Sequence, residues 1–374
     1  MEERSLPRRP SARSRIYRRL HEATGFCSRQ SLADDLGLSL PTVYQNLTEL
    51  MEDGLVCESG EQQSTGGRKA MGLGIVPEAR FAVGVSVSEK WLRFAAADLN
   101  LRELAYRKVP FAAIRKDTAE VSSFAAELER FLDETGLDRA RLLGVGVTLP
   151  GVLSPDGGRI LLAPTLGLRD VPLEALTRDL PYPTHVENDA TSGGHAEWHA
   201  RGGQRNMAYL SLETGVGGAV LIGGVPYGGD NGRSGEFGHM CVEAGGLRCS
   251  CGKQGCLEAY CSARRISDDL GITLEDFFSG LERHNPEYEA LWSDLLRHLA
   301  LGVGSIHRVL DCDVVLGGSL TRWLPPYLPL LRRYVADGNP FTHDADFLHL
   351  SVLHDHTPPL GAALYFVRQF VASV

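Results

Sequence analysis

The sequence predicts an α/β protein that follows a small N-terminal domain of helices and a hairpin. After Arg80, apolar strand-like runs alternate with segments of helical spacing, a pattern typical of an α/β domain with layered helices. Before Arg80, three short helical patterns precede a hairpin pattern. Glycine supplies 42 of the 374 residues, above its usual level of about 7%, so many backbone positions need tight turns or close approaches.

Length and composition exclude several classes of protein. A chain of 374 residues suits two or three domains at roughly 100 to 200 residues each. Apolar residues at 43% and charged residues at 23% argue against wholesale disorder, collagen-like repeats and coiled coils. No apolar run approaches the roughly 18 to 20 residues of a membrane span, and the start lacks the apolar core of a signal peptide. We therefore expect a cytoplasmic protein.

The net charge of −9 is unevenly distributed along the chain. Residues 1–30 hold eight arginines and three acidic residues, a balance of +5, whereas residues 71–374 carry −9. The acidic bulk argues against nonspecific nucleic-acid binding by the whole molecule, while the arginine-rich start could meet phosphates. A solvated basic tail explains this charge equally well, so the neighbouring elements must decide.

The N-terminal segment from Ser14 predicts three helices with recognisable ends. The first is expected to stop at Gly25 and the second at Gly37. Ser39 is a good N-cap for the third helix, and Pro41 lies in its first turn, where a missing N–H costs little. The second and third helices are joined by a short turn from Gly37 to Ser39. Two helices joined in this way are typical of a helix-turn-helix, whose second helix enters the major groove of DNA.

The polar face of the third helix predicts contacts to DNA bases. Gly54 should close this helix, residues 55–57 should form a strand, and residues 58–68 should form a polar loop that acts as a wing. A dimerisation or protein-docking module is the alternative reading of the same three helices and hairpin. The candidate DNA-binding residues are Pro41, Thr42, Tyr44, Gln45 and Asn46 on the helix, with Arg68 and Lys69 at the far end of the loop.

Beyond Arg80 the predicted elements follow one another in order. Strands are expected over residues 81–87, 92–97, 142–149, 207–212, 216–222 and 314–316. Helices are expected over residues 118–135, from Asp189 through Glu197, and in a long region over residues 263–310. The first two strands should pair with each other.

A run of cysteines predicts a metal site. Of eight cysteines, three stand close together as Cys249, Cys251 and Cys256, and His239 lies ten residues upstream. Three thiolates and one imidazole make a closed tetrahedral set, the composition of structural zinc, with no open position for a zinc-bound water. Reactive or merely buried thiols are the alternative.

These and other motifs resemble the ROK family, named for repressors, open reading frames and sugar kinases. The run from Gly235 to His239, followed by the cysteine run as far as Glu258, is similar to the family signature almost residue for residue. Similar motifs are Glu187-Asn188-Asp189-Ala190, the Leu149-Pro150-Gly151 turn and the Gly317-Gly318 turn. The resemblance covers about residues 80–374. It implies the two-lobed actin-like sugar-kinase fold with a cleft between the lobes, preceded here by a winged helix-turn-helix.

The resemblance also implies a sugar site and a division into domains. Sugar hydroxyls donate and accept, so carboxylates, an amide and an imidazole complement them. Taken singly, each of the implied sugar-binding residues listed below would more simply be a helix cap or a surface carboxylate. The expected domains are 1–76, 77–190 and 191–374, with the final helix packed on the first lobe. The implied sugar-binding residues are Gly151, Asn188, Asp189, Glu236, His239 and Glu258.

Departures from the kinases bear on activity. The family's first phosphate loop has Asp followed by Gly-Gly-Thr, whereas this sequence has the stretch from Ser86 to Lys90, including Glu89. Glu213 stands where the second loop of the kinases usually has glycine. Like charges near a polyphosphate should cripple phosphoryl transfer, so Asp189 would be only a vestigial general base. His195 and His199, an i, i+4 pair, are read as surface or interlobe packing residues.

The sequence therefore predicts a sugar-responsive DNA-binding transcriptional regulator, most simply a repressor without kinase activity. Its expected cofactor is structural Zn²⁺, and its expected partners are operator DNA, a monosaccharide effector and further copies of itself in a dimer or tetramer. An active ATP-dependent sugar kinase with an appended DNA-binding domain is the alternative, and a protein-interaction scaffold is a third reading.

Overall fold

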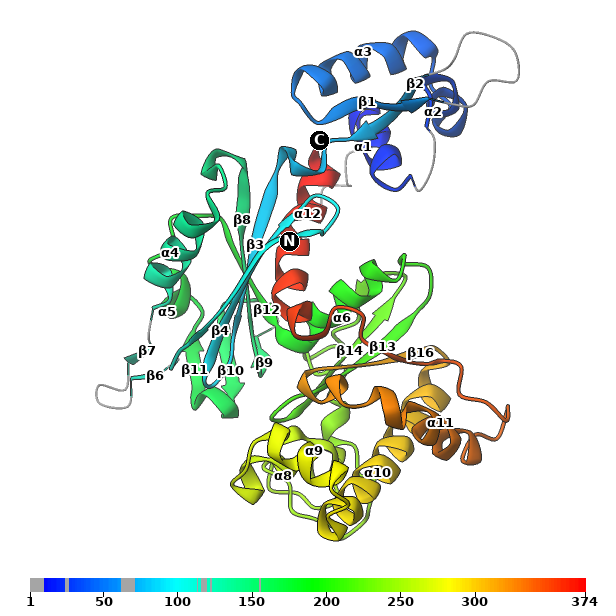
Figure 1. Cartoon of the computed structure of the whole chain (residues 1–374). Helices are drawn as coiled ribbons and strands as arrows, with labels where there is room; N and C mark the ends of the chain where they lie inside the picture. The colour runs from blue at the N-terminus through cyan, green and yellow to red at the C-terminus, as the bar shows by residue number, and fades with distance from the viewer. Residues whose placement is uncertain are drawn as a thin grey trace.

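The structure, a computed structural model, describes residues 10–23, 27–61, 71–112, 114–115, 120–121, 123–154 and 156–374. It consists of a small N-terminal domain and two lobes, each of which contains a five-stranded sheet (Figure 1). The predicted α/β class is confirmed.

The N-terminal domain is three helices and a two-stranded antiparallel sheet. Its elements are α1 (Ala12–His21), α2 (Arg29–Leu36), α3 (Leu40–Glu52), β1 (Val56–Glu61) and β2 (Met71–Ile75). The predicted caps are present: Gly37 is left-handed with φ 60°, and the Ser39 hydroxyl accepts a hydrogen bond of 3.3 Å from Thr42 N. Gly25, the expected stop of the first helix, lies outside the described residues.

The first strand of the hairpin is longer than the sequence pattern predicted. We expected a strand over 55–57 and a loop from Glu58, but β1 continues through Glu61 and pairs Glu58 with Leu73 and Glu61 with Met71. A strand can continue through polar residues where an apolar partner strand accepts its backbone hydrogen bonds, and hydropathy alone does not reveal that partner.

The first lobe is built on a mixed sheet in the order β12-β8-β3-β4-β5. The β3, β4 and β5 strands form an antiparallel meander, as predicted for the first two, and β8 and β12 add in parallel. The strands are β3 (Phe81–Val87), β4 (Trp91–Asp98), β5 (Glu103–Pro110), β8 (Leu142–Leu149) and β12 (Thr184–Asn188). β5 and β12 carried no signal strong enough for a sequence prediction.

One predicted helix of this lobe begins later than expected. We predicted residues 118–135, but α4 spans Ala125–Thr135, and Glu120–Val121 forms the short strand β7, which pairs with β6 (Ile114–Arg115). The Ser123 hydroxyl accepts a hydrogen bond of 3.3 Å from Ala125 N, which favours a start there. The remaining small elements are β9 (Val152–Leu153), β10 (Arg159–Ala163), β11 (Leu168–Pro172) and α5 (Glu174–Thr177).

The second lobe is built on the sheet β15-β14-β13-β16-β17. Its strands are β13 (Met207–Leu212), β14 (Val216–Ile222), β15 (Val225–Pro226), β16 (Asp313–Gly317) and β17 (Leu348–Leu350). Its helices are α6 (Asp189–Ala200), α7 (Leu257–Cys261), α8 (Ala263–Ile266), α9 (Leu274–Glu282), α10 (Pro286–Leu310) and α11 (Leu328–Asp337). The long helical region predicted over 263–310 is therefore three helices. They are separated at left-handed Gly271 and at the N-cap Asn285.

The last helix, α12 (Thr357–Ser373), packs on the sheet of the first lobe although the second lobe precedes it in sequence (Figure 1). Two strand glycines allow this approach, because a Cβ at Gly84 would lie 1.6 Å from Pro359 O and one at Gly146 would lie 2.1 Å from Ala362 O. α12 also packs on α6: a Cβ at Gly361 would lie 1.9 Å from Ser192 O.

The N-terminal domain contacts the C-terminal end of α12. The Arg18 guanidinium donates a hydrogen bond of 2.9 Å to Ala372 O, and the rings of Tyr17 and Phe370 meet edge to face at 6.2 Å. The buried side chains of this domain form one hydrophobic cluster with those of α12. Among the described residues, no helix is long and apolar enough to cross a membrane.

Candidate functional site

The cysteine run folds into a compact loop before α7, and it brings the four predicted metal ligands together. The ligand atoms of His239, Cys249, Cys251 and Cys256 all lie within 4.8 Å of one another. Glycines make the loop possible, since Gly252 and Gly255 have φ of 86° and 83°.

The donor set fits a closed tetrahedral zinc site. Cys249 Sγ lies 3.8 Å from His239 Nδ1, and the Sγ atoms of Cys251 and Cys256 are 3.7 Å apart. Burial, together with the neighbouring thiols, raises the pKa of Cys256 to about 12. Zn²⁺ prefers a set of three cysteine sulfurs and one imidazole, and metal binding would displace the protons of these thiols.

His239 links the cysteine loop to a carboxylate outside it. Its Nδ1 faces Cys249, while its Nε2 lies 3.9 Å from Glu236 Oε2. Burial raises the pKa of Glu236. The two nitrogens of this imidazole thus face the thiol cluster on one side and a carboxylate on the other.

Glu258 ties the same loop to the turn between β13 and β14. Its Oε1 accepts a hydrogen bond of 2.8 Å from the Ser250 hydroxyl, and its Oε2 accepts one of 3.1 Å from Val216 N. A Cβ at Gly215 would lie 2.8 Å from Glu258 Oε2, so a larger residue there would force this carboxylate to move.

Asn188 and Asp189 lie where β12 passes into α6. The Asn188 side-chain oxygen caps α6 by accepting a hydrogen bond of 2.9 Å from Thr191 N. Its amide nitrogen donates a hydrogen bond of 2.9 Å to Gly151 O. Burial raises the pKa of Asp189 to about 6. The Oδ1 atom of Asp189 accepts a hydrogen bond of 2.8 Å from Ala190 N. Gly151 has φ 119°, and a Cβ there would lie 2.3 Å from Leu162 O, so this turn admits only glycine.

An ion pair that sequence reasoning missed joins the two lobes. Arg93 Nη1, from β4, lies 3.6 Å from Glu213 Oε1, in the turn after β13. A second ion pair joins the lobes, with Lys90 Nζ 3.7 Å from Asp268 Oδ1. A charged residue inside the apolar run of the predicted strand 92–97 is the signal that could have revealed Arg93, because a buried charge needs a partner.

The candidate base-reading residues occupy the outward face of α3. Pro41, Tyr44 and Gln45 are exposed, while Thr42 and Asn46 are partly exposed. The Tyr44 ring, 53% exposed, lies 5.2 Å from the Arg29 guanidinium, and Asn46 Nδ2 donates 2.8 Å to the carbonyl of Thr42. Arg68 and Lys69 lie outside the described residues.

The histidine pair of α6 serves packing. His195 Nε2 contacts Gly224 O at 3.1 Å and the guanidinium of Arg368 on α12. Burial lowers the pKa of His195 to about 4 and also lowers that of His199. Within the described chain, neither belongs to the group of residues that could hold a metal.

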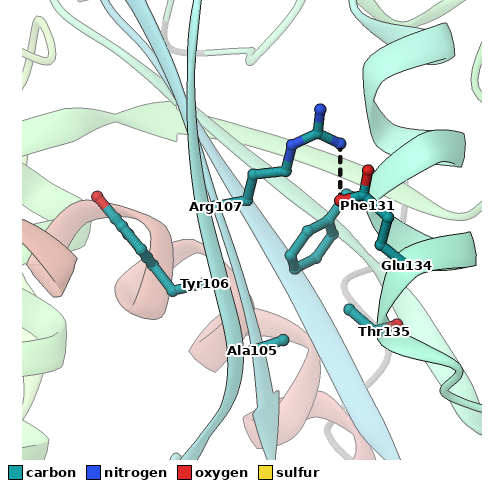
Figure 2. A pocket seen from close by; sticks show the side chains of 6 residues that line it. All are labelled: Ala105, Tyr106, Arg107, Phe131, Glu134 and Thr135. Carbon is teal, nitrogen blue, oxygen red and sulfur yellow. Dashed lines mark ion pairs between the residues drawn. The ribbon is translucent and has the colours of Figure 1, made fainter.

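A hollow of about 180 Å³ lies between β5 and α4, away from all the residues above (Figure 2). Arg107 Nη1 lies 3.2 Å from Glu134 Oε2 at this hollow, so its one basic group is neutralised. None of the residues predicted from the sequence to form a site lines it.

The fold and site define a class: a two-lobed domain of the sugar-kinase type with a winged helix-turn-helix attached. The profile of the ROK family matches residues 82–369, and that of the winged helix-turn-helix DNA-binding domain matches residues 12–56. The chain belongs to the ROK family, and it is a sugar-responsive DNA-binding regulator of transcription within it.

Known relatives and a solved structure agree with this class. The chain is 27% identical to the xylose repressor of Bacillus subtilis (strain 168) over 324 residues, covering 84% of this chain and 79% of the relative. It is 32% identical to the DNA-binding transcriptional dual regulator NagC of Escherichia coli (strain K12) over 256 residues, 67% of this chain and 62% of that protein. The fold matches a ROK family transcriptional regulator, a homologue of the E. coli MLC protein, with a TM-score of 0.75 at 22% identity and 96% coverage of each chain.

Proposed function

We propose that this regulator is a repressor whose operator affinity changes when a monosaccharide binds between its lobes. The effector would contact the six residues that resemble the family's sugar ligands: Gly151, Asn188, Asp189, Glu236, His239 and Glu258. The observation that carries the proposal is the path of α12, which packs on α6 beside Asn188 and Asp189 and also contacts α1 of the DNA-binding domain.

The chemistry of these side chains suits a sugar. Carboxylates accept hydrogen bonds from hydroxyl groups, and an amide and an imidazole can both donate and accept. A sugar can shift the lobes only if it contacts both sides better in one arrangement than in the other. Movement of α12 against α6 would then reach the recognition helix α3 through α1.

We further propose that zinc is structural, held by His239, Cys249, Cys251 and Cys256. With four protein ligands, the metal would order the loop that carries His239 toward Glu236 and would have no open position for chemistry. Glu258 accepts a hydrogen bond from Ser250 inside this loop, which supports a sugar site that depends on loop order.

Kinase activity is not part of this proposal. Ser86 and Glu89 stand where the kinases have an aspartate and a glycine, and Glu213 lies at the second loop in an ion pair with Arg93. These carboxylates disfavour a polyphosphate. The relatives named as repressors favour the regulator over the alternative, an active sugar kinase. Sugar-dependent ATP turnover at the level of an ordinary sugar kinase would restore that alternative.

For DNA, we propose that α3 enters the major groove with Pro41, Thr42, Tyr44, Gln45 and Asn46 toward the bases, and that Arg68 and Lys69 meet phosphates. The proposed domains are 1–76, 77–190 and 191–374, supported by the end of β2 at Ile75 and by the start of α6 at Asp189. A cytoplasmic dimer or tetramer on a twofold operator completes the proposal.

The decisive experiment is an operator titration with and without the sugar found by a thermal-shift screen. Xylose enters the screen first, because the relative from Bacillus subtilis is named a xylose repressor. Wild type should change operator affinity by about 1 to 3 kcal/mol on sugar binding, and Asp189→Asn should respond less because its amide is a poorer acceptor. Equal responses of the two proteins would mean that Asp189 is not part of the sensor.

A further inference from the structure

The ion pair between Arg93 and Glu213 joins the two lobes. The Arg93 side chain is only 11% exposed and that of Glu213 is 27% exposed, so water screens this pair less than it screens a surface pair. Arg93 belongs to β4 of the first lobe, and Glu213 directly follows β13 of the second. The pair is thus a direct electrostatic contact between the lobes.

The turn that carries Glu213 lies close to two of the proposed sugar ligands, Glu258 and Asp189. The main-chain N–H of Val216, at the start of β14 directly after this turn, donates to Glu258 Oε2 at 3.1 Å. On its other side, a Cβ at Gly217 would lie 3.1 Å from the Cβ of Ala190, the residue next to Asp189. Glu213 raises the pKa of Asp189 in addition to the effect of burial, whereas Arg93 lowers it. Arg93, Glu213 and Asp189 therefore share one electrostatic environment.

Acidic groups outnumber basic groups in this environment. The carboxylates of Glu213 and Asp189 both interact electrostatically with the guanidinium of Arg93, and Glu213 already pairs with that guanidinium. A bound phosphate needs a cation or several N–H donors that are free to turn toward it. Here a phosphate would have to displace Glu213 from Arg93 and remain beside the carboxylate of Asp189.

We propose that Glu213 acts as an internal substitute for a phosphate group on Arg93, and that the site therefore selects a neutral, unphosphorylated monosaccharide over its phosphate ester. This inference rests on the proposed sugar-sensing function and adds the charge class of the effector. It also gives Arg93 a role: the residue holds the second lobe to the first through a carboxylate of the protein itself.

The first test compares each sugar with its own phosphate ester. Thermal shift and titration calorimetry would use xylose and its 5-phosphate, glucose and glucose 6-phosphate, and N-acetylglucosamine and its 6-phosphate, with full-length protein loaded with zinc. The neutral member of the responding pair should bind at least about tenfold more tightly, since each like charge nearby opposes the ester. Equal or tighter binding of the ester would overturn this inference and leave sugar sensing intact. A response to none of a full panel of sugars and esters would instead contradict the proposed function.

The second test does not depend on knowing the sugar. Inorganic phosphate is the probe, and Glu213→Gln is the variant, because it removes the charge while keeping the size of the side chain. Glu213→Gln should gain phosphate binding that wild type lacks, and the double variant Arg93→Gln/Glu213→Gln should lose it again. Glu78→Gln, which disturbs an exposed pair with Arg102 at 3.8 Å, is the matched control and should bind no phosphate.

Two outcomes of this second test decide the role of the pair. Phosphate binding by Glu213→Gln but not by the double variant supports the inference. No phosphate binding by a folded Glu213→Gln protein overturns it. If Glu213→Gln fails to fold, as judged by circular dichroism, Glu213→Gly takes its place, because glycine is the residue that the kinases usually have there.

Discussion

The hydroxyl of Ser14 in α1 donates a hydrogen bond of 3.1 Å to the main-chain carbonyl of Ala372 in α12. Ser14 is only 4% exposed, so this bond is inside the contact between the DNA-binding domain and the sensor domain. Because α12 also packs on α6, the bond is the last of a series of contacts that leads from the proposed sugar ligands to the DNA-binding domain.

Ser14→Ala should weaken the response to sugar more than it weakens DNA binding. The substitution removes one of two bonds to Ala372 O without touching α3, so basal operator affinity should stay within about twofold, while the coupling between sugar and DNA should fall below the wild-type value of about 1 to 3 kcal/mol. The bond from Arg18 to the same carbonyl remains. Operator titrations with and without sugar measure both quantities. Ser305→Ala, which removes a 2.8 Å bond to Leu301 O within α10, is the control. A full response in Ser14→Ala would show that coupling takes another route.

Cys251→Ser should lose zinc and the sugar response together. Removal of one thiolate opens a closed site whose metal binding is coupled to the folding of its loop. Metal analysis of purified protein and the sugar thermal shift provide the measurements. Cys57→Ser changes an exposed cysteine outside the cluster and should keep both properties. Wild-type protein without zinc and with freely reactive thiols would contradict the zinc proposal.

Gln45→Ala and Asn46→Ala should relax the sequence preference of DNA binding. Each lost base contact should cost about 1 to 3 kcal/mol of discrimination, whereas loss of the Arg68 charge should weaken all DNA sequences alike. Binding measurements on an operator and on single-base variants of it distinguish the two effects. Full operator affinity in a chain lacking residues 1–76 would refute the assignment of DNA binding to this domain.

Asp189→Asn should stabilise the fold at neutral pH. Burial raises the pKa of Asp189 from 3.8 to about 6, so the folded protein holds this proton more tightly than the unfolded chain does. In wild type, the contribution of the Asp189 carboxyl to the free energy of unfolding therefore becomes less favourable as pH rises from 3.8 to about 6. The full destabilisation is present above that window. The variant should be about 1 to 3 kcal/mol more stable near neutral pH.

Denaturant unfolding of wild type and Asp189→Asn at several pH values tests this expectation. The difference in free energy of unfolding between the two proteins should shrink as pH falls toward 4 and disappear below the lower end of the window. A difference that does not depend on pH, or a wild type that is more stable than the variant at neutral pH, would mean that the ionised Asp189 carboxylate does not destabilise the folded protein.

Local signals in the sequence predicted the parts of the fold that depend on near neighbours. Gly37 and Ser39 mark the turn before α3 because capping involves only the adjacent backbone, and the cysteine run is recognisable because its ligands are close in sequence. The start of α4 at Ala125 and the extension of β1 to Glu61 were mispredicted, because pairing with other strands decides them. The pair of Arg93 and Glu213 was missed for the same reason: its partners come from different lobes.

The placement of α12 has a consequence for the synthesis of the protein on the ribosome. Gly84 and Gly146 leave room on the first sheet for a helix that is synthesised only after the whole second lobe. Until residues 357–373 emerge from the ribosome, the apolar residues of the first sheet and of the DNA-binding domain that pack against α12 remain exposed to solvent. We therefore expect truncated translation products to be targets for chaperones and proteases, so that only finished chains can compete for the operator.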